Sequence, residues 1–436
     1  MESNDKRFMV LGKTAIARVL TLVALVSGAG CTSMQQAGAP DEKRWLLTST
    51  LLYVAPDRPP LANAWLLVNN DKIEAVGTDT PPAGIRSEGA CNGGVIAAGF
   101  QNSHVHFTDE SFTDAATRAP GELEQSLTRM LTRFGYTTVV DTASALANTK
   151  ALRDRISNGS VRGPEILTAG APLYPHNGIP FYLNQLPPEM LRQLPQPATI
   201  EEALAIVRQN LANGANGTKL FIASPMGNDV IRRMSPQIAS AAAEETHKRG
   251  GLVMVHPTDP DGVRAAVTAG ADIIVHTTID PPNSAWDAQL IADMVARKVS
   301  VVPTLQLWRY ELDKAHVPAE VRESIVGLAE RQLKAFVDAG GQVLFGTDVG
   351  YMTDFNPTDE YVLMARTGMT PMQILASLTT APAARWHKEA VRGRLEPGMA
   401  ANLVVLNGDP ATDVKRFGDV KCSFASGSLI FQREGF

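Results

Sequence analysis

The chain has 436 residues, of which 44% are hydrophobic and 19% charged, and its formal net charge at pH 7 is -5. This composition is typical of a globular protein and excludes a wholly disordered or fibrous chain. Because Lys and Arg are scattered and form no basic run, we do not expect a nucleic acid as a partner. The length suits one large domain with a smaller unit beside it.

Residues 1–30 have the pattern of a signal peptide. Basic residues precede the apolar stretch Val19 to Val26, which is too short to span a bilayer and is followed by small residues. Cys31 comes next in a context that resembles a bacterial lipobox, although Gly28 stands where Leu is usual. We therefore expect an exported bacterial protein, periplasmic or membrane-anchored through a lipid on Cys31, with residues 31–44 as a tether. Soluble export and an uncleaved anchor stay open.

Both ends of the remaining chain predict short strands. Apolar runs at Trp45 to Leu52, Ala64 to Asn69 and Lys72 to Val76 are broken by Pro, Asn, Asp and Gly, and the same texture returns at Leu403 to Leu406 and Ser428 to Phe431. The sequence therefore predicts one small β unit made from residues 45–97 and 390–436. Cys91 and Cys422 fall in these two parts, and an oxidising compartment would permit a bridge between them, but a single pair is a weak signal and free buried cysteine is common, so the sequence favours free cysteines over a disulfide.

Between these parts, residues 98–389 predict a parallel sheet. Helical patterns such as Ile200 to Ala212 and Ser235 to Arg249 alternate with apolar, β-branched runs, which predict buried strands. The predicted strands are Thr137 to Asp141, Glu165 to Ala169, Gly217 to Ile222, Leu252 to His256, Ile273 to His276, Val299 to Pro303 and Val343 to Gly346. Repetition over this length, without a glycine-rich GxGxxG after the first strand, favours an α/β fold of the (β/α)8 TIM barrel type over an open doubly wound sheet.

Polar residues with metal-binding side chains follow several of these strands. His104 and His106 come after the strand-like run Gly94 to Ala98, and their i, i+2 spacing puts both imidazoles on one face of a strand. His256, His276 and Asp348 likewise end or follow apolar runs. Barrel enzymes keep their catalytic residues at the carboxyl ends of strands, so the sequence predicts a metal site there.

Lys219 lies inside the apolar run Gly217 to Ile222. A buried ammonium is costly, and burial lowers the pKa of lysine, so the neutral amine becomes available. Such an amine can react with carbon dioxide to form a carbamate, whose two oxygens suit a bridge between two metal ions.

Taken together, these motifs resemble the imidazolonepropionase-like branch of the amidohydrolase superfamily, which includes metal-dependent dipeptidases. From Trp45 to the C-terminus, the resemblance rests on the His-x-His pair, "GYTTVVDTAS", "GPEILTAG", Lys219, "VMVHP", "ADIIVHTT", "VLFGTDVG", "MTPMQILASLTTAPA" and "GRLEPGMAANLVVLNGDP". It implies that the small β unit is a sandwich. It also implies two divalent metal ions, expected to be zinc, with one bound by His104, His106 and Asp348, the other by His256 and His276, and carboxylated Lys219 as the bridge.

The chain departs from the family pattern at three places. Asn102 replaces the usual Asp two residues before the first His. Val275 and Thr277 flank His276 where dipeptidase-like relatives carry Glu and Gly, which makes peptidase specificity less secure than hydrolysis. The first few residues after His256 contain no Glu, the proton-shuttling acid of the mononuclear deaminases, so deamination is disfavoured.

We expect an enzyme that hydrolyses a C-N bond of a small substrate, such as an acyl-amino acid or a dipeptide. A metal-bridging hydroxide would attack the carbonyl, and Asp348 would accept the proton and pass it to the leaving nitrogen. The alternatives are a mononuclear imidazolonepropionase-type hydrolase of cyclic amides and a non-catalytic, lipid-anchored binding protein. His176, Arg309 and Tyr351 follow predicted strands and are candidates for substrate binding, Arg309 through a bidentate pair with a carboxylate. The chain could form a homo-oligomer.

Overall fold

The computed structural model describes residues 44–279 and 285–434, so the predicted signal peptide and tether lie outside the described residues. The described residues all belong to one compact unit. The architecture is mixed α/β, with eight parallel strands in two sheets, one of five strands and one of three. These strands are β7 Phe100–Val105, β8 Tyr136–Asp141, β9 Glu165–Thr168, β10 Gly217–Phe221, β13 Leu252–His256, β14 Ile273–Val275, β15 Ser300–Val302 and β16 Gln342–Val343.

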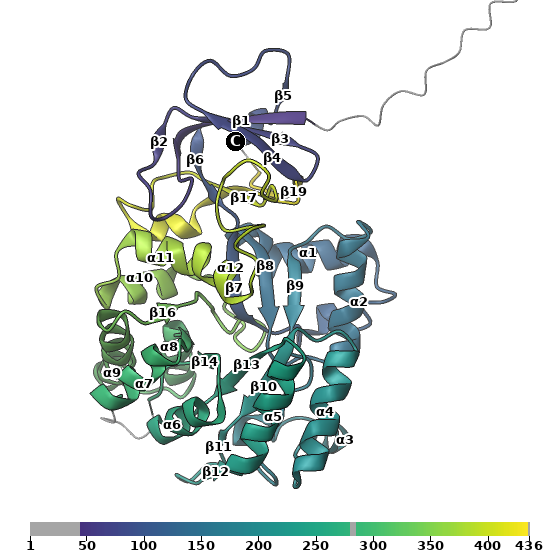
Figure 1. The fold of residues 1–436 in the computed structure, drawn as a ribbon, viewed down its shortest axis with the longest axis vertical. Coiled ribbons are helices and arrows are strands. Elements are labelled where there is room, and N and C mark those ends of the chain that lie inside the picture. Colours follow the sequence, from purple (N-terminus) through teal and green to yellow (C-terminus); the bar gives the residue numbers. More distant parts are fainter. Residues whose placement is uncertain (1–43, 280–284, 435–436) are drawn as a thin grey trace, which may run out of the picture. The chain divides into compact units, whose positions relative to one another are not determined.

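The two parallel sheets are joined by backbone contacts at both of their junctions. Beyond β9, the amide of Leu173 donates to the Lys219 carbonyl of β10 at 2.9 Å. At the other junction, the Ser103 amide of β7 donates to the Phe345 carbonyl at 2.7 Å, just past β16. Figure 1 shows the helices packed around these strands.

Helices follow most of the parallel strands, as the alternating pattern predicts. They are α1 Pro120–Met130, α2 Leu146–Ser157, α3 Pro188–Gln193, α4 Ile200–Ala212, α5 Pro236–Lys248, α6 Pro260–Ala269, α7 Ala288–Ala296, α8 Leu305–Lys314, α9 Ala319–Asp338, α10 Thr358–Arg366, α11 Pro371–Leu378 and α12 Thr380–Arg385. Several begin at side chains that accept an amide hydrogen bond, such as Thr199 before α4 and Asp259 before α6. The predicted helices at Ile200 to Ala212 and Ser235 to Arg249 are confirmed.

Strands from both chain ends share a nine-stranded sheet. Its strands are β1 Arg44–Leu52, β2 Leu61–Ala62, β3 Trp65–Asn69, β4 Lys72–Gly77, β5 Arg86–Ser87, β6 Gly94–Ala98, β17 Leu403–Leu406, β18 Val420–Ala425 and β19 Ser428–Gln432. β6 pairs with β1 on one side and with β17 on the other. The ring of Trp45 stacks on that of Phe424 at 4.7 Å, so residues from the two ends also share a core. The sandwich and the domain boundaries stay predictions.

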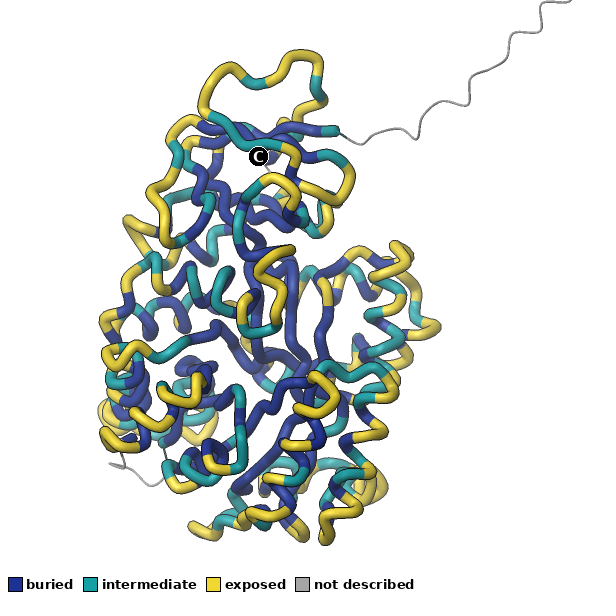
Figure 2. Tube along the Cα trace, viewed as in Figure 1, coloured by how far each residue is buried: buried dark blue, intermediate teal, exposed yellow. Residues whose placement is uncertain are grey.

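The central strands are more deeply buried than the helices and loops around them. In Figure 2 the central strands are dark blue and the exposed segments lie on the outer helices and loops. Within the parallel strands, alternate side chains such as Leu252, Met254, Ile273 and Val275 form a cluster of their own. In the described part of the chain, no helix combines the length and apolar character needed to cross a membrane.

The structure shortens five of the predicted strands, since β9 and β10 each end one residue early, and it adds a strand before the His pair. β14, β15 and β16 end earlier than their apolar runs, and His276 leaves β14 with φ +80. Gly94 to Ala98 is not the strand that leads to the His pair, because β6 belongs to the nine-stranded sheet and a separate strand, β7, carries His104. Gly99 separates the two, and a Cβ there would lie 2.3 Å from Thr137 Oγ1.

Cys91 and Cys422 form a disulfide, which settles the question that the sequence left open. Cys91 ends the short 3-10 helix η1 (Gly89–Cys91), and Cys422 lies in β18. Both side chains are buried, and 331 residues of sequence separate them. The bond therefore closes a very long loop and joins the two chain ends within one sheet.

We expect the double variant Cys91→Ala/Cys422→Ala to lose on the order of 2–5 kcal/mol of unfolding free energy, because a long closed loop restricts the unfolded chain. Urea unfolding of the mature protein measures the loss. Reduced wild type serves as the control and should unfold near the midpoint of the variant. Equal midpoints for oxidised wild type and variant would contradict a stabilising bond.

Candidate active site

β7 places His104 at its end, and His106 follows directly after it. The two imidazole rings meet edge to face with centroids 5.1 Å apart, and their Nε2 atoms are 3.2 Å apart. Both side chains are buried. The segment after β16 packs closely here, because a Cβ on Gly350 would lie 1.9 Å from the His106 carbonyl oxygen. The predicted convergence of the two imidazoles is present in the structure.

Asp348 meets this histidine pair from the segment after β16. Its backbone has φ +62, and its amide donates to the His104 carbonyl at 2.9 Å. This turn directs the carboxylate inward, where Oδ1 lies 2.7 Å from His106 Nε2 and 3.3 Å from His104 Nε2. The strained backbone conformation of a non-glycine residue is typical of functional sites.

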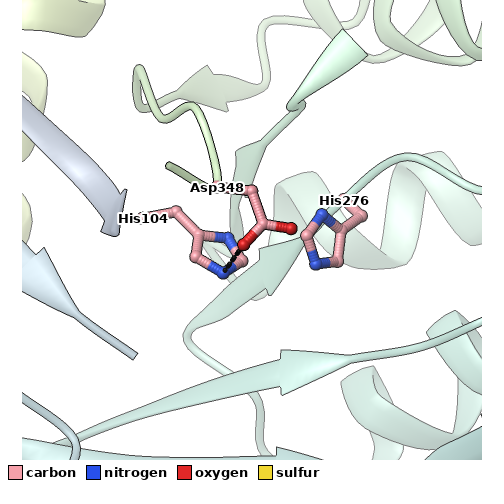
Figure 3. A group of neighbouring side chains, drawn as sticks. All are labelled: His104, His276 and Asp348. Atoms are coloured by element: carbon pink, nitrogen blue, oxygen red, sulfur yellow. Dashed lines mark ion pairs between the residues drawn. The ribbon is translucent and has the colours of Figure 1, made fainter. Parts of the chain in front are cut away.

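His276 approaches the same carboxylate from the end of β14. His104, His276 and Asp348 each offer a ligand atom, and these atoms lie within 4.8 Å of one another. Figure 3 shows the Asp348 carboxylate between the two imidazoles. His256, the last residue of β13, brings its ring centroid to 5.0 Å from that of His276 and stacks on Phe221 at 4.6 Å.

The spacing of these atoms is compatible with a zinc ion. Zinc binds imidazole nitrogen at about 2.0–2.1 Å, so two tetrahedral ligands of one ion lie about 3.4 Å apart. The separations of 3.2 Å between the Nε2 atoms of His104 and His106 and of 3.3 Å between His104 Nε2 and Asp348 Oδ1 are close to this value. Imidazole nitrogens with one carboxylate are also a donor set that zinc favours.

Lys219 enters the site from the middle of β10, in register with Met254 of β13. Lys219 is 1% exposed, and its Nζ lies 5.4 Å from the centre of the Phe221 ring. Burial lowers the pKa of Lys219 to about 7, although Asp348 and Asp141 oppose this shift. At neutral pH, Lys219 is therefore the neutral amine in a substantial fraction of the molecules.

The neighbouring histidines are held in their neutral form. Burial lowers the pKa of His104, His256 and His276 well below the ordinary value, and the charge of Lys219 acts in the same direction. A neutral imidazole is the form that binds a metal ion.

Asp141, at the end of β8, was missed as a functional residue by the sequence analysis. It is fully buried, and its carboxylate accepts hydrogen bonds from the hydroxyls of Ser144 (2.5 Å), Thr149 (3.0 Å) and Thr168 (2.9 Å). Burial raises the pKa of Asp141, and these hydrogen bonds and His106 oppose the shift. Ser144 also accepts from the Phe107 amide at 2.8 Å, so Asp141 helps to fix the segment after His106. Its place at a strand end was the signal that could have found it.

The three candidates for substrate binding have different surroundings. Arg309, in α8, is paired with Asp359 at 3.0 Å and with Glu323 at 3.3 Å, so its guanidinium is not the free fork that the sequence suggested. His176 is exposed, with Nδ1 3.3 Å from the Gln196 carbonyl oxygen. The ring of Tyr351 lies 5.7 Å from that of Tyr182, and burial raises its pKa. Their roles toward a substrate stay predictions.

The chain is similar in sequence and in fold to known proteins. The chain is 25% identical over 421 residues to ochratoxinase of Aspergillus niger, covering 87% of this chain and 85% of the relative. Its structure is similar to that of a Xaa-Pro dipeptidase with bound methionine (TM-score 0.76, 20% identity, 89% of this chain and 100% of the other). A putative prolidase from Bifidobacterium longum has a TM-score of 0.73 and 25% identity over 91% of this chain and 97% of its own. The family model described as "Amidohydrolase family" matches residues 95–430, and the chain therefore belongs to the amidohydrolase family.

Proposed function

We propose that this protein is an exported amidohydrolase with two metal ions that cleaves an amide or peptide-like C-N bond of a small substrate. The observation that carries the proposal is the meeting of His104, His106, His276 and Asp348 beside the buried amine of Lys219. These side chains come from four strands or strand ends far apart in the sequence. Core packing alone does not require five polar side chains in one buried place.

The proposal takes the eight parallel strands as a closed (β/α)8 barrel. Support comes from the hydrogen bonds that join the two sheets at both junctions, Leu173 to Lys219 and Ser103 to Phe345. In such a barrel, the carboxyl ends of the strands surround one opening, where catalytic residues collect. His104, His256, His276 and Asp348 all lie at or just beyond such ends.

The residues divide into two proposed ligand sets around one bridging group. His104, His106 and Asp348 would hold one ion, and His256 and His276 the other, with carboxylated Lys219 shared between them. The lowered pKa of Lys219 supports this assignment, because only the neutral amine reacts with carbon dioxide. When bound, the two ions would polarise the substrate carbonyl and make the attacking water more acidic.

The protein's own residues then have distinct tasks. Asp348 accepts the proton of the attacking water and passes it to the leaving nitrogen, which makes the amine a better leaving group. The carboxylate of Asp348 is held at this point by the backbone conformation at φ +62 and by the hydrogen bond that the Asp348 amide donates to the His104 carbonyl. Acyl-amino acids and dipeptides are the proposed substrates, and the ochratoxinase and Xaa-Pro dipeptidase relatives are consistent with this class.

Export is part of the proposal because of the N-terminal sequence and the disulfide. Disulfides persist in oxidising compartments and are rare in a reducing cytosol, so the Cys91–Cys422 bond fits a periplasmic location. The basic start, the apolar stretch and Cys31 supply the proposed route and lipid attachment.

The variant Asp348→Asn should lower the turnover number by at least about a hundredfold, since the amide cannot accept the proton. Steady-state kinetics with acyl-amino acid and dipeptide libraries, on zinc-loaded protein, provide the measurement. Asp338→Asn is the control, because Asp338 is an exposed residue of α9 paired with Lys334, and it should keep wild-type turnover. Full turnover in Asp348→Asn would remove Asp348 from the mechanism.

Wild-type protein prepared with bicarbonate should bind close to two zinc ions per chain, and Lys219→Ala should lose metal and activity together. Short-chain carboxylic acids should partly restore Lys219→Ala, because they fit the vacated space and offer two oxygens. Lys219→Met fills that space and should not respond to them. Elemental analysis and activity assays measure both effects. One bound ion in active wild type, with Lys219→Ala still active, would favour the mononuclear alternative.

Replacement of Cys31 by Ser should move the protein from the membrane fraction to the soluble or uncleaved pool, since no thiol remains for lipid attachment. Cell fractionation and mass spectrometry of the mature N-terminus follow the change. Unchanged fractionation together with a lipid-free N-terminus in the wild type would exclude the lipoprotein assignment.

A further inference from the structure

Thr304, between β15 and α8, has an unusual backbone conformation, and its hydroxyl makes two hydrogen-bond contacts. Its φ is +44, in the left-handed region that β-branched residues rarely adopt. The side chain is fully buried, with Oγ1 2.7 Å from His276 Nδ1 and 2.9 Å from the Pro303 carbonyl oxygen. The left-handed turn therefore brings a hydroxyl to the ring of a proposed metal ligand.

The two contacts of Thr304 favour a proton on Nδ1 of His276. The hydroxyl has one proton, and the Pro303 carbonyl oxygen only accepts. When Thr304 donates to Pro303, its oxygen is left to accept from Nδ1–H of His276. Thr277 repeats this arrangement, because it accepts from Trp308 Nε1 at 2.9 Å and donates to the same carbonyl at 3.2 Å. With its proton on Nδ1, His276 keeps the lone pair of Nε2 for a metal ion.

Thr304 is also the N-cap residue of α8, but it does not cap the helix. A threonine at this position usually accepts an amide hydrogen bond from the first turn. Thr199 before α4 and Thr370 before α11 do so, with φ of -125 and -70. Among the residues that the structure describes, no amide of α8 donates to the Thr304 side chain. Its hydroxyl is used at His276 instead.

Glu360 of α10 supplies the missing cap. Its carboxylate accepts a hydrogen bond from the Gln306 amide at 2.7 Å, in the first turn of α8. Glu360 is completely buried, which raises its pKa to about 8, and the backbone amides of Gln306 and Leu305 oppose this shift. A carboxyl group 54 residues along the chain thus satisfies an amide of α8 that the adjacent threonine leaves open.

We propose that Thr304 and Glu360 together position His276: Thr304 fixes the Nδ1–H tautomer, and Glu360 caps α8 in place of Thr304. This inference rests on the proposed function in one respect, namely that His276 binds a metal ion. Both are positioning residues, because they act through His276 and through α8.

Thr304→Val, which has the same shape without the hydroxyl, should weaken zinc binding about 10- to 100-fold, the range found when a partner of a metal-binding histidine is removed. Thr304→Ser restores the hydroxyl and should bring zinc affinity back toward wild type. Competition titration of the metal-free full chain with zinc and a chelator measures the dissociation constant.

Thr370→Val is the matched control, because Thr370 is an ordinary N-cap. It should lower the melting temperature by about 1 to 2 °C and leave zinc affinity unchanged. An equal zinc affinity in Thr304→Val and wild type would overturn the role of Thr304.

Glu360→Gln keeps an acceptor oxygen and should retain the wild-type zinc affinity, whereas Glu360→Met has similar length without an acceptor and should weaken binding at least about tenfold. If Glu360→Met does not fold, Glu360→Gln remains decisive in a second measurement, since its His276 tautomer should match wild type. Wild-type zinc affinity in a folded Glu360→Met would overturn the role of Glu360.

Nitrogen NMR of metal-free protein labelled in its histidine rings tests the tautomer directly, with His276→Asn to assign the signals. We expect Nδ1 of His276 to be protonated in wild type, Thr304→Ser and Glu360→Gln, and a mixture of tautomers in Thr304→Val. Protonated Nε2 in wild type would overturn the inference whatever the metal content. By contrast, a correct tautomer in a protein that binds no zinc would support the positioning and contradict the proposed function.

Discussion

Lys219 brings an amine into the interior of a parallel strand where water does not reach it, and the surrounding site depends on how that amine is accommodated. Its neighbours in β13 are the apolar side chains that a buried parallel strand requires, and its charged partners, Asp348 and Asp141, are themselves buried. An ammonium at this position would oppose any nearby cation, and it adds to burial in lowering the pKa of the imidazoles of His104 and His256. Neutral imidazoles and a neutral or carboxylated lysine are all compatible with the binding of metal ions.

The backbone contributes as much to the site as the choice of side chains. His276, Thr304 and Asp348 all have positive φ in the segments that follow their strands. Each of these turns carries strain, which the tight packing between neighbouring strands maintains. In each case the turn redirects a side chain that a regular strand would have sent to one of its two faces. The network of Asp141 with Ser144, Thr149 and Thr168 performs a similar task for the segment after His106.

Sequence patterns predicted the strands that carry the site, because buried parallel strands have a distinct apolar texture and the polar residues interrupt it at their ends. His104, His276 and Asp348 were predicted to converge for this reason, and their ligand atoms do lie together. Partners distant in sequence were not predictable from local patterns. Arg309 binds Glu323 and Asp359, and Glu360 caps a helix 54 residues away, and no periodicity indicates either pairing. The predicted strands also run past the observed strand ends, since a turn with positive φ leaves no mark in an apolar run.

The sheet shared by the two chain ends has a consequence for the order of assembly. β6 is made early in synthesis, but its partner β17 is made much later, and Cys422 follows Cys91 by 331 residues. Until β17 and Cys422 arrive, β6 presents an open edge, which is prone to pairing with other chains, and Cys91 has a free thiol. Formation of the disulfide therefore requires that the chain has been delivered at least as far as Cys422, and a chain broken before Val420 would keep the free thiol of Cys91.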